Sequence, residues 1–343
     1  MVKVSFKPKQ VTKKLLSELP DRARDVLTKR YGLGTDSDTQ TLESIGQTYG
    51  ITRERVRQIE NYGIAAVQKS SACKETATVF QELRGVVDDL GGIISEAQLL
   101  SLLASDESTK NHFYFILVVG EAFTKQKEDD NFEHRWHVAG DKAKSVENAI
   151  KQLHKTIEED DLVPEAELIT KLSEQLATEN IKTADQNVLL RWLGLSNVLD
   201  RNPLGEWGMA SSPNVRAKGI RDFAYLAVKR HGSPMHFREV SEAIEKLFAR
   251  QAHVATCHNE LIKDQRFVLV GRGLYALTEW GYTAGVVKDV LREILKKHGP
   301  LTRDEIIDKV RKERYVKDNT IVVNLQDAAL FRKLSDGSFA IAE

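Results

Sequence analysis

Cysteine is scarce in this sequence, and long hydrophobic runs are missing from it. The 343 residues include two cysteines, Cys73 and Cys257, which are too few and too far apart for a disulfide framework. Such scarcity agrees with a reducing compartment. The longest apolar stretches are a few residues, such as 113–119, whereas a membrane helix needs roughly 20. We therefore expect neither a disulfide-stabilised secreted domain nor a membrane-spanning protein.

The sequence also has few signs of catalysis or of a bound cofactor. It contains no Gly-x-Ser-x-Gly, Walker or paired-carboxylate signature, and VGRGLY lacks the acidic partner of a dinucleotide fold. His253, Cys257 and His258 have helical spacing, but no second cysteine pair completes a zinc site. We therefore expect no enzyme, no cofactor, no metal and no small-molecule substrate.

Charge is distributed unevenly, although the formal net charge is zero. Residues 1–72 carry 13 basic and 8 acidic side chains (+5), and residues 216–343 carry 23 and 17 (+6). Residues 73–215 carry 14 and 25 (−11). Basic ends can approach a polyanion, whereas an acidic middle is repelled by one. Ordinary solvated faces would give the same counts, so charge alone does not decide.

Residues 11–34 contain two helical patterns. Val11, Leu15 and Leu16 recur at helical spacing, and this pattern stops at Pro20, which suits the start of a second helix. That helix runs to Tyr31 and ends at the glycines that follow. Its expected inward residues are Ala23, Val26, Leu27 and Tyr31. Its expected solvent- or phosphate-facing residues are Arg22, Arg24, Lys29 and Arg30.

A helix-turn-helix is predicted next. Thr41 caps a third helix, Gly50 ends it, and Thr52 caps a fourth helix that begins at Arg53. The expected buried side of the fourth helix consists of Val56, Ile59, Ile64 and Val67. Its opposite face consists of Arg53, Glu54, Arg57, Gln58 and Asn61. These polar side chains lie in the first turns, where a recognition helix contacts base edges in the major groove.

The segments LPDRARDVLTKRYGL and TLESIGQTYGITRERVRQIE resemble region four of the housekeeping bacterial sigma factors. The resemblance covers residues 11–70, and TRERVRQIE is close to the family's signature for the helix that reads the promoter −35 element. The base-reading residues that it implies are Arg53, Glu54, Arg57 and Gln58. The phosphate-contacting residues are Arg22, Thr41, Thr52 and Arg55. Arg57 also occupies a phosphate position of the family, and Arg55 is expected nearer the module's own side.

The same resemblance implies double-stranded DNA and the flap of bacterial RNA polymerase as partners. Because the sequence shows neither a membrane helix nor a secretory signal, we expect a cytoplasmic, nucleoid-associated location. The match starts about ten residues into the sequence, and MVKVSFKPKQ shows no secretory signal. We therefore expect the sigma modules that hold the melted −10 strand to be missing, so that the chain cannot open a promoter alone. Residues 62–65 replace the basic tail usual in the family, which predicts modest nonspecific affinity.

The remaining sequence contains repeats. The segment beginning KRHGSPMHFREVSEAI aligns with the one beginning KKHGPLTRDEIIDKV. Each predicts three helices and a two-stranded ribbon, closed at Gly271–Gly273 or at Asp336–Gly337. Three helices with a hairpin make a winged helix, and residues 217–284 resemble the HARE-type winged helix. That type is found in a polymerase accessory subunit and in proteins tied to DNA modification or chromatin. Fainter copies are predicted from residue 79 and over residues 145–210.

The predicted fold class is therefore mainly α with small β-wings: a sigma-region-four-like helix-turn-helix followed by a string of winged-helix modules. The predicted domains are the helix-turn-helix at 1–72, acidic winged-helix-like modules at 73–140 and 141–215, the HARE-type module at 216–284 and a C-terminal winged helix at 285–343. A second DNA-contact surface is predicted from Thr256, His258, Asn259, Lys263 and Arg272, with Arg266 beside the wing. Winged helices also bind proteins, so both kinds of contact stay open for residues 217–343.

These patterns together predict a transcription regulator that binds double-stranded DNA at a −35-like element and contacts RNA polymerase. One alternative is a polymerase-associated or sigma-competing factor whose module grips the flap and never reads bases. Another is a DNA-sensing subunit of a restriction or modification system, which depends on the HARE resemblance alone.

Overall fold

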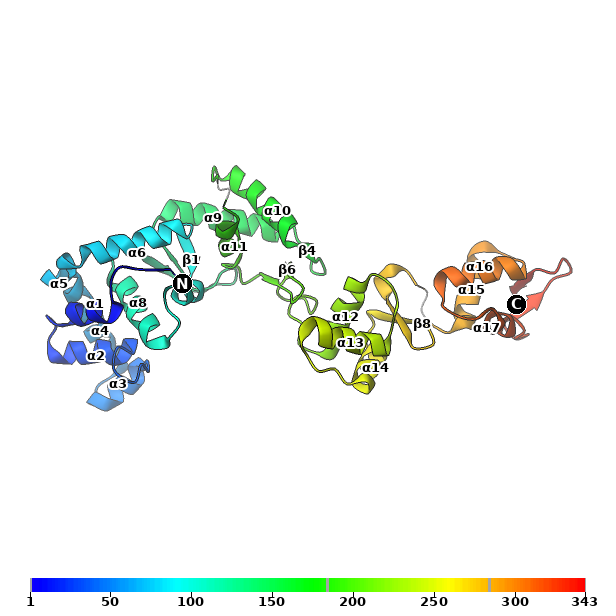
Figure 1. Ribbon diagram of the computed structural model, residues 1–343, viewed down its shortest axis with the longest axis horizontal. Coiled ribbons are helices and arrows are strands. Elements are labelled where there is room, and N and C mark those ends of the chain that lie inside the picture. The colour runs from blue at the N-terminus through cyan, green and yellow to red at the C-terminus, as the bar shows by residue number, and fades with distance from the viewer. Residues whose placement is uncertain (1, 183–184, 283–284, 343) are drawn as a thin grey trace. The chain divides into compact units, whose positions relative to one another are not determined.

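A computed structural model of the chain describes residues 2–182, 185–282 and 285–342. The chain is mainly helical with small sheets, and it divides into two compact units (Figure 1). The first unit comprises residues 1–200 and 207–210, and the second comprises residues 201–206 and 211–343. The predicted fold class, mainly α with small β-wings behind a helix-turn-helix, is confirmed. None of the helices in the described ranges combines the length and hydropathy that crossing a bilayer requires.

The first helices of the chain follow the predicted pattern. They are α1 (Pro8–Leu16), α2 (Asp21–Tyr31), α3 (Leu42–Tyr49), α4 (Arg53–Lys69) and α5 (Ser71–Glu75). Thr41 and Thr52 cap α3 and α4 as predicted. Gly32 and Gly50 end α2 and α3 in the left-handed conformation, with φ of 60° and 64°. This conformation suits glycine because it lacks a Cβ atom.

A helix–strand–helix–helix–strand–strand order then occurs three times. The first set is α6 (Ala77–Asp89), β1 (Ile93–Ser95), α7 (Glu96–Leu103), α8 (Glu107–Val119), β2 (Thr124–Gln126) and β3 (Arg135–His137). The second is α9 (Gly140–His154), β4 (Val163–Pro164), α10 (Glu165–Thr178), α11 (Gln186–Leu193), β5 (Leu199–Arg201) and β6 (Glu206–Met209). The third is α12 (Ile220–His231), β7 (Met235–His236), α13 (Phe237–Phe248), α14 (Val254–Lys263), β8 (Phe267–Gly271) and β9 (Leu274–Leu277).

The last segment has the same helices with a smaller sheet. Its elements are the 3-10 helix η1 (Thr278–Trp280), α15 (Val287–His298), α16 (Arg303–Glu313), α17 (Asp318–Leu325), β10 (Phe331–Lys333) and β11 (Phe339–Ile341). The strand orders are β1-β3-β2, β4-β6-β5, β7-β9-β8 and β10-β11, and a bridge from Leu301 to Phe339 adds to the last sheet. The three helices and the two-stranded ribbon of each segment are those that the repeats predict, whereas the short strands β1, β4 and β7 between the first and second helices were not predicted. The winged-helix and HARE assignments remain predictions.

Burial along β8 of the β8–β9 ribbon does not alternate residue by residue. Phe267 pairs with Leu277 and Leu269 with Tyr275, so the predicted two-stranded ribbon is present. Leu269, however, is 47% exposed. Val268 and Val270, on the other side of the strand, are buried in a cluster of their own because Trp280 and Tyr282 cover that face.

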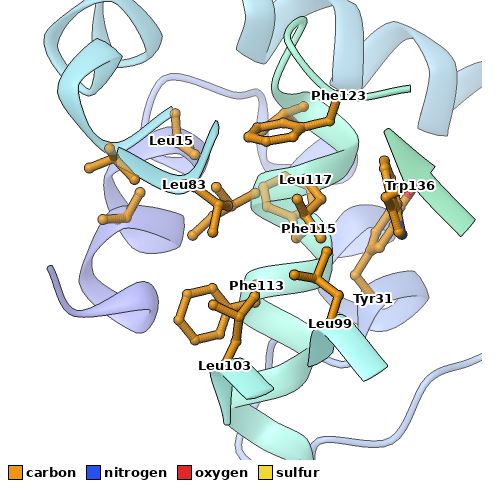
Figure 2. Close-up of a cluster of buried hydrophobic side chains, with 14 of the residues drawn as sticks. Leu15, Tyr31, Leu83, Leu99, Leu103, Phe113, Phe115, Leu117, Phe123 and Trp136 are labelled. Carbon is orange, nitrogen blue, oxygen red and sulfur yellow. The ribbon is translucent and has the colours of Figure 1, made fainter. Parts of the chain in front are cut away.

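One hydrophobic core joins the sigma-like helices to the segment that follows them. Figure 2 shows Tyr31 of α2 and Leu15 of α1 beside Phe113, Phe115 and Leu117 of α8. The rings of Tyr31 and Phe115 lie 5.3 Å apart in an edge-to-face arrangement. Helix α8 was the predicted third helix of the 73–140 module. Its apolar residues pack against α1, α2 and α4 as well as against α7 of the same predicted module.

Candidate nucleic-acid interface

The helix-turn-helix is held together by a small core and one close backbone approach. Val26, Ile45 and Val56 come from α2, α3 and α4 and are fully buried against one another. In the turn, a Cβ atom built on Gly46 would lie 2.6 Å from the carbonyl oxygen of Ile51. No real side chain tolerates that distance, so glycine at 46 lets the start of α4 cross close to α3.

The N-terminus of α4 is open and carries free donor groups. The Thr52 hydroxyl accepts a hydrogen bond from the Arg55 backbone N–H at 3.2 Å, and the Thr41 hydroxyl accepts one from that of Ser44 at 3.1 Å. Both hydroxyls can still donate their own hydrogen. The remaining N–H groups of the first turn and the helix dipole favour a negative group such as a phosphate.

The predicted base-reading residues all lie exposed at the start of α4. Arg53, Glu54, Arg57 and Gln58 are solvent-accessible, as is Asn61 one turn further on. Arg57 donates two hydrogen bonds to the Glu54 carboxylate, at 2.9 and 2.6 Å. These bonds lower the pKa of Glu54 and raise that of Arg57. The structure therefore brings the four residues together and places two of them in a charge-neutralising pair.

The predicted phosphate-contacting residues lie on α2 and at the starts of α3 and α4. Arg22 is exposed, with its guanidinium 5.2 Å from the centre of the Tyr49 ring. Arg55 donates a hydrogen bond to the Gln58 side chain at 2.9 Å. Arg55 is exposed, and its bond orients a base-reading candidate.

Two basic residues of α2, which the sequence pattern predicts to face solvent or phosphate, form ion pairs within the domain. Lys29 pairs with Asp25 at 2.7 Å and lies 5.0 Å from the Tyr49 ring. Burial opposes ionisation of Asp25, but hydrogen bonds from Lys29 and Tyr49 outweigh it and lower the pKa of that carboxyl. Arg30 pairs with Glu60 of α4 at 3.4 Å. The four-residue spacing of Asp25 and Lys29 was the sequence signal for the first pair.

The predicted second surface lies on α14 and the β8–β9 turn. Thr256, Asn259, Lys263 and Arg272 are exposed. His258 is less accessible because its ring stacks on Phe237, with centroids 4.2 Å apart. Arg266 is not a free cation beside the wing, since it donates hydrogen bonds to Asp222 and Asp264 at 2.9 and 2.6 Å. Val254 and Ile262 on the same helix are also exposed, so α14 presents both polar and apolar side chains to solvent.

The His253, Cys257 and His258 trio is not gathered into one site. Cys257 is fully buried, and burial raises the pKa of its thiol to about 11. His253 is exposed, and the ring of His258 packs on Phe237. Within the described ranges, no group of three or more His, Cys, Asp or Glu side chains is placed to hold a metal ion.

A capped, exposed second helix on a tight turn defines this segment as a helix-turn-helix module. Residues 15–69 match the family Sigma-70, region 4. The RNA polymerase sigma factor SigA of Listeria monocytogenes is 40% identical over 67 residues, which make up 20% of this chain and 18% of that protein. SigA of Listeria innocua gives the same values. The chain thus carries a sigma-70 region 4 domain, and it spans less than a fifth of the length of these curated relatives.

Proposed function

We propose that this chain is a sequence-specific DNA-binding regulator of transcription and not an enzyme. Its region 4 domain inserts the start of α4 into the major groove of a −35-like duplex. Arg53, Glu54, Arg57 and Gln58 read base edges there, while Arg22, Thr41, Thr52 and Arg55 contact phosphates.

The observation that carries this proposal is the open N-terminal half of α4. Its polar side chains are exposed, and its apolar side is buried, with Val56 and Val67 fully inaccessible. Arginine pairs bidentately with guanine, glutamine with adenine, and glutamate accepts from cytosine. A glutamate among arginines is unfavourable beside phosphates, so its presence on this face supports base reading over general attraction to DNA.

Selection of binding sites from a random duplex library, followed by titration of the selected duplex, tests the proposal. Arg53→Ala and Gln58→Ala should each cost about 1–3 kcal/mol on the selected duplex and relax preference at one position. Arg22→Ala should weaken all duplexes alike and make the salt dependence shallower by about one unit of slope. Lys69→Ala, at the far end of α4, is the matched control for loss of charge.

Failure of the library to yield any preferred sequence would contradict base reading. Equal losses on selected and random duplexes in Arg53→Ala and Gln58→Ala would contradict it as well. In either case the region 4 domain would bind DNA without reading it, or would bind a protein.

We also propose that residues 216–284 form a HARE-type winged helix that docks a protein, with RNA polymerase as the partner. The exposed apolar side chains Ile262 (62%) and Leu269 (47%) support protein contact over phosphate contact. Purified bacterial RNA polymerase should retain the unmodified chain and release Ile262→Glu. The control is Val323→Glu on α17, where an equally exposed apolar side chain (64%) lies in the next segment. Equal retention of both variants would contradict this docking.

A further inference from the structure

A cavity of about 370 Å³ lies between α1, α2 and α8, inside the first unit. Three cationic side chains line it: Lys9 and Lys13 from α1 and Arg24 from α2. Leu16 and Leu33 supply apolar walls, and three hydroxyl-bearing residues complete the polar part of the lining. A pocket of this size, with apolar walls and a few convergent polar groups, is typical of small-molecule sites.

The cavity also contains a buried histidine with unsatisfied nitrogens. His112 of α8 is 3% exposed and lines the cavity. Neither of its ring nitrogens has a hydrogen-bond partner among the described residues. Buried polar groups in proteins are nearly always hydrogen-bonded, so an imidazole that lacks partners beside a cavity indicates that a hydrogen-bonding group is missing there.

The positive charge of the cavity is only partly compensated. In the described part of the chain, no carboxylate lies within 4.0 Å of the ammonium group of Lys9 or Lys13. Arg24 pairs with Asp21 at 3.2 Å, but Asp21 is almost fully exposed, and Arg24 also donates to the Leu19 carbonyl at 2.9 Å. Three cations around one concave surface concentrate positive potential where an anion can enter.

This cavity is separate from the proposed DNA-reading face. On α2, Asp25 and Lys29 contact Tyr49 of α3, which belongs to the helix-turn-helix. Arg24 and Thr28 point to the cavity, and adjacent helical positions differ in direction by about 100°. The cavity therefore opens beside α1 and α8, away from the α3 contact of α2.

We propose that this cavity binds a phosphate-bearing small molecule of mononucleotide size. Lys9, Lys13 and Arg24 hold the phosphate, and the rest of the molecule lies against Leu16, Leu33 and the His112 ring. Ammonium and guanidinium groups bind phosphate through charge-assisted hydrogen bonds, which are stronger than neutral ones. Because the site is formed by two sigma-like helices and α8, its occupation ties these elements together.

Calorimetric titration of the full chain with adenosine monophosphate tests the proposal, with adenosine as the uncharged match. The Lys9→Ala/Lys13→Ala variant should lose affinity for the monophosphate by about tenfold or more. Lys14→Ala is the matched control: Lys14 lies on the same helix, pairs with Glu75 at 2.8 Å and does not line the cavity. This variant should bind the monophosphate as the unmodified chain does.

The His112 imidazole gives a second readout by NMR titration. Burial and the Lys9 charge lower the pKa of His112, and Asp106 opposes them. Lys13 and Arg24 are the other cations at this cavity. An anion bound there favours the imidazolium, so the pKa of His112 should rise when the monophosphate is added and should stay unchanged with adenosine.

The proposal would be overturned if adenosine bound as tightly as the monophosphate, if Lys14→Ala lost as much affinity as the double variant, or if the pKa of His112 stayed unchanged. Displacement of the monophosphate by a duplex would show that the lysines belong to a DNA footprint, and this too would overturn it. None of these results depends on Arg53 or Gln58, so the pocket and the DNA-reading face succeed or fail separately.

Discussion

Arg57 and Glu54 form a two-point ion pair on the exposed start of α4, with N···O distances of 2.9 and 2.6 Å. The pair holds both side chains in one orientation before any ligand is bound. It also removes one positive charge from the face that the proposed function directs at DNA. Exposed ion pairs contribute little to stability, so this pair matters more for charge and orientation than for folding.

Breaking the Glu54–Arg57 pair should lower the sequence selectivity of DNA binding and raise the affinity for duplexes of any sequence. In Glu54→Gln, Arg57 is released to contact a phosphate, so binding to random duplexes should strengthen and its salt dependence should become steeper by about one unit of slope. Fluorescence anisotropy over a range of salt concentrations measures both. Glu107→Gln is the matched control, because Glu107 pairs with Lys110 at the same three-residue spacing on α8. Weaker binding of Glu54→Gln to random duplexes would contradict the prediction.

A single methyl group added at Gly46, in α3 beside the turn to α4, should destabilise the fold. Gly46→Ala brings a Cβ atom against the Ile51 carbonyl oxygen, and such overpacking costs about 1–3 kcal/mol of unfolding free energy. Gly85→Ala provides the contrast, since nothing lies within 4 Å of a Cβ atom there. Alanine in the interior of α6 should instead stabilise by up to about 1 kcal/mol. Urea denaturation of both variants measures the difference, and equal stability would refute the close approach.

Loss of the Phe115 ring should destabilise the region 4 domain, although Phe115 lies outside that domain in the sequence. Phe115→Ala removes a fully buried ring in contact with Tyr31 and should cost about 3–5 kcal/mol. Hydrogen exchange should rise in α1, α2 and α4. Phe132→Ala removes an equally buried ring from the separate cluster formed by α9, α10 and α11. In Phe132→Ala, hydrogen exchange should rise in α9, α10 and α11. An exchange pattern identical to that of Phe115→Ala would argue that α8 does not stabilise the region 4 helices in particular.

Mild acid should destabilise the first unit through His154. Burial and the nearby Lys151 charge lower the pKa of His154 to about 4, and the ring bonds to the Ser196 hydroxyl at 2.9 Å. An unfolded histidine has a pKa of about 6.5, so the unfolded state binds more protons between these values. Stability is therefore complete above about pH 6.5 and falls as the pH is lowered toward 4, by about 2 kcal/mol at pH 5.

His154→Gln isolates this contribution, because burial also lowers the pKa of His112 and His137 and both act in the same direction. Chemical denaturation at several pH values should show a flatter profile for the variant. Parallel profiles for the two proteins would assign the acid sensitivity to other groups.

Local signals account for what could be predicted from the sequence. The helix ends are marked by residues next to them in the sequence: Thr41 and Thr52 at the starts of α3 and α4, and Gly32 and Gly50 at the ends of α2 and α3. The helix-turn-helix and its exposed face could therefore be predicted closely. The two-stranded β8–β9 ribbon could be predicted because glycines mark its turn. The Glu54–Arg57 and Asp25–Lys29 pairs were also local, at three- and four-residue spacing, and could have been found by the same rules.

Contacts between distant segments could not be predicted in this way. The apolar run in α8 indicated burial but not its partner, and the partner proved to be the region 4 helices about 80 residues earlier, as in the Tyr31–Phe115 contact. Arg266 reads as a cation beside a wing, yet Asp222, which is 44 residues away, satisfies it. The residues that adjoin Phe115 or Arg266 in the sequence carry no signal for partners so far away along the chain.

The dependence of the region 4 helices on α8 has a consequence for any exchange of parts between proteins. A graft that carried residues 1–72 alone would leave the contact face of Tyr31 and Leu15 without its cover, and it would misfold or recruit a foreign apolar surface. Recombination that moves the region 4 helices into another protein must therefore carry α8 as part of the same segment.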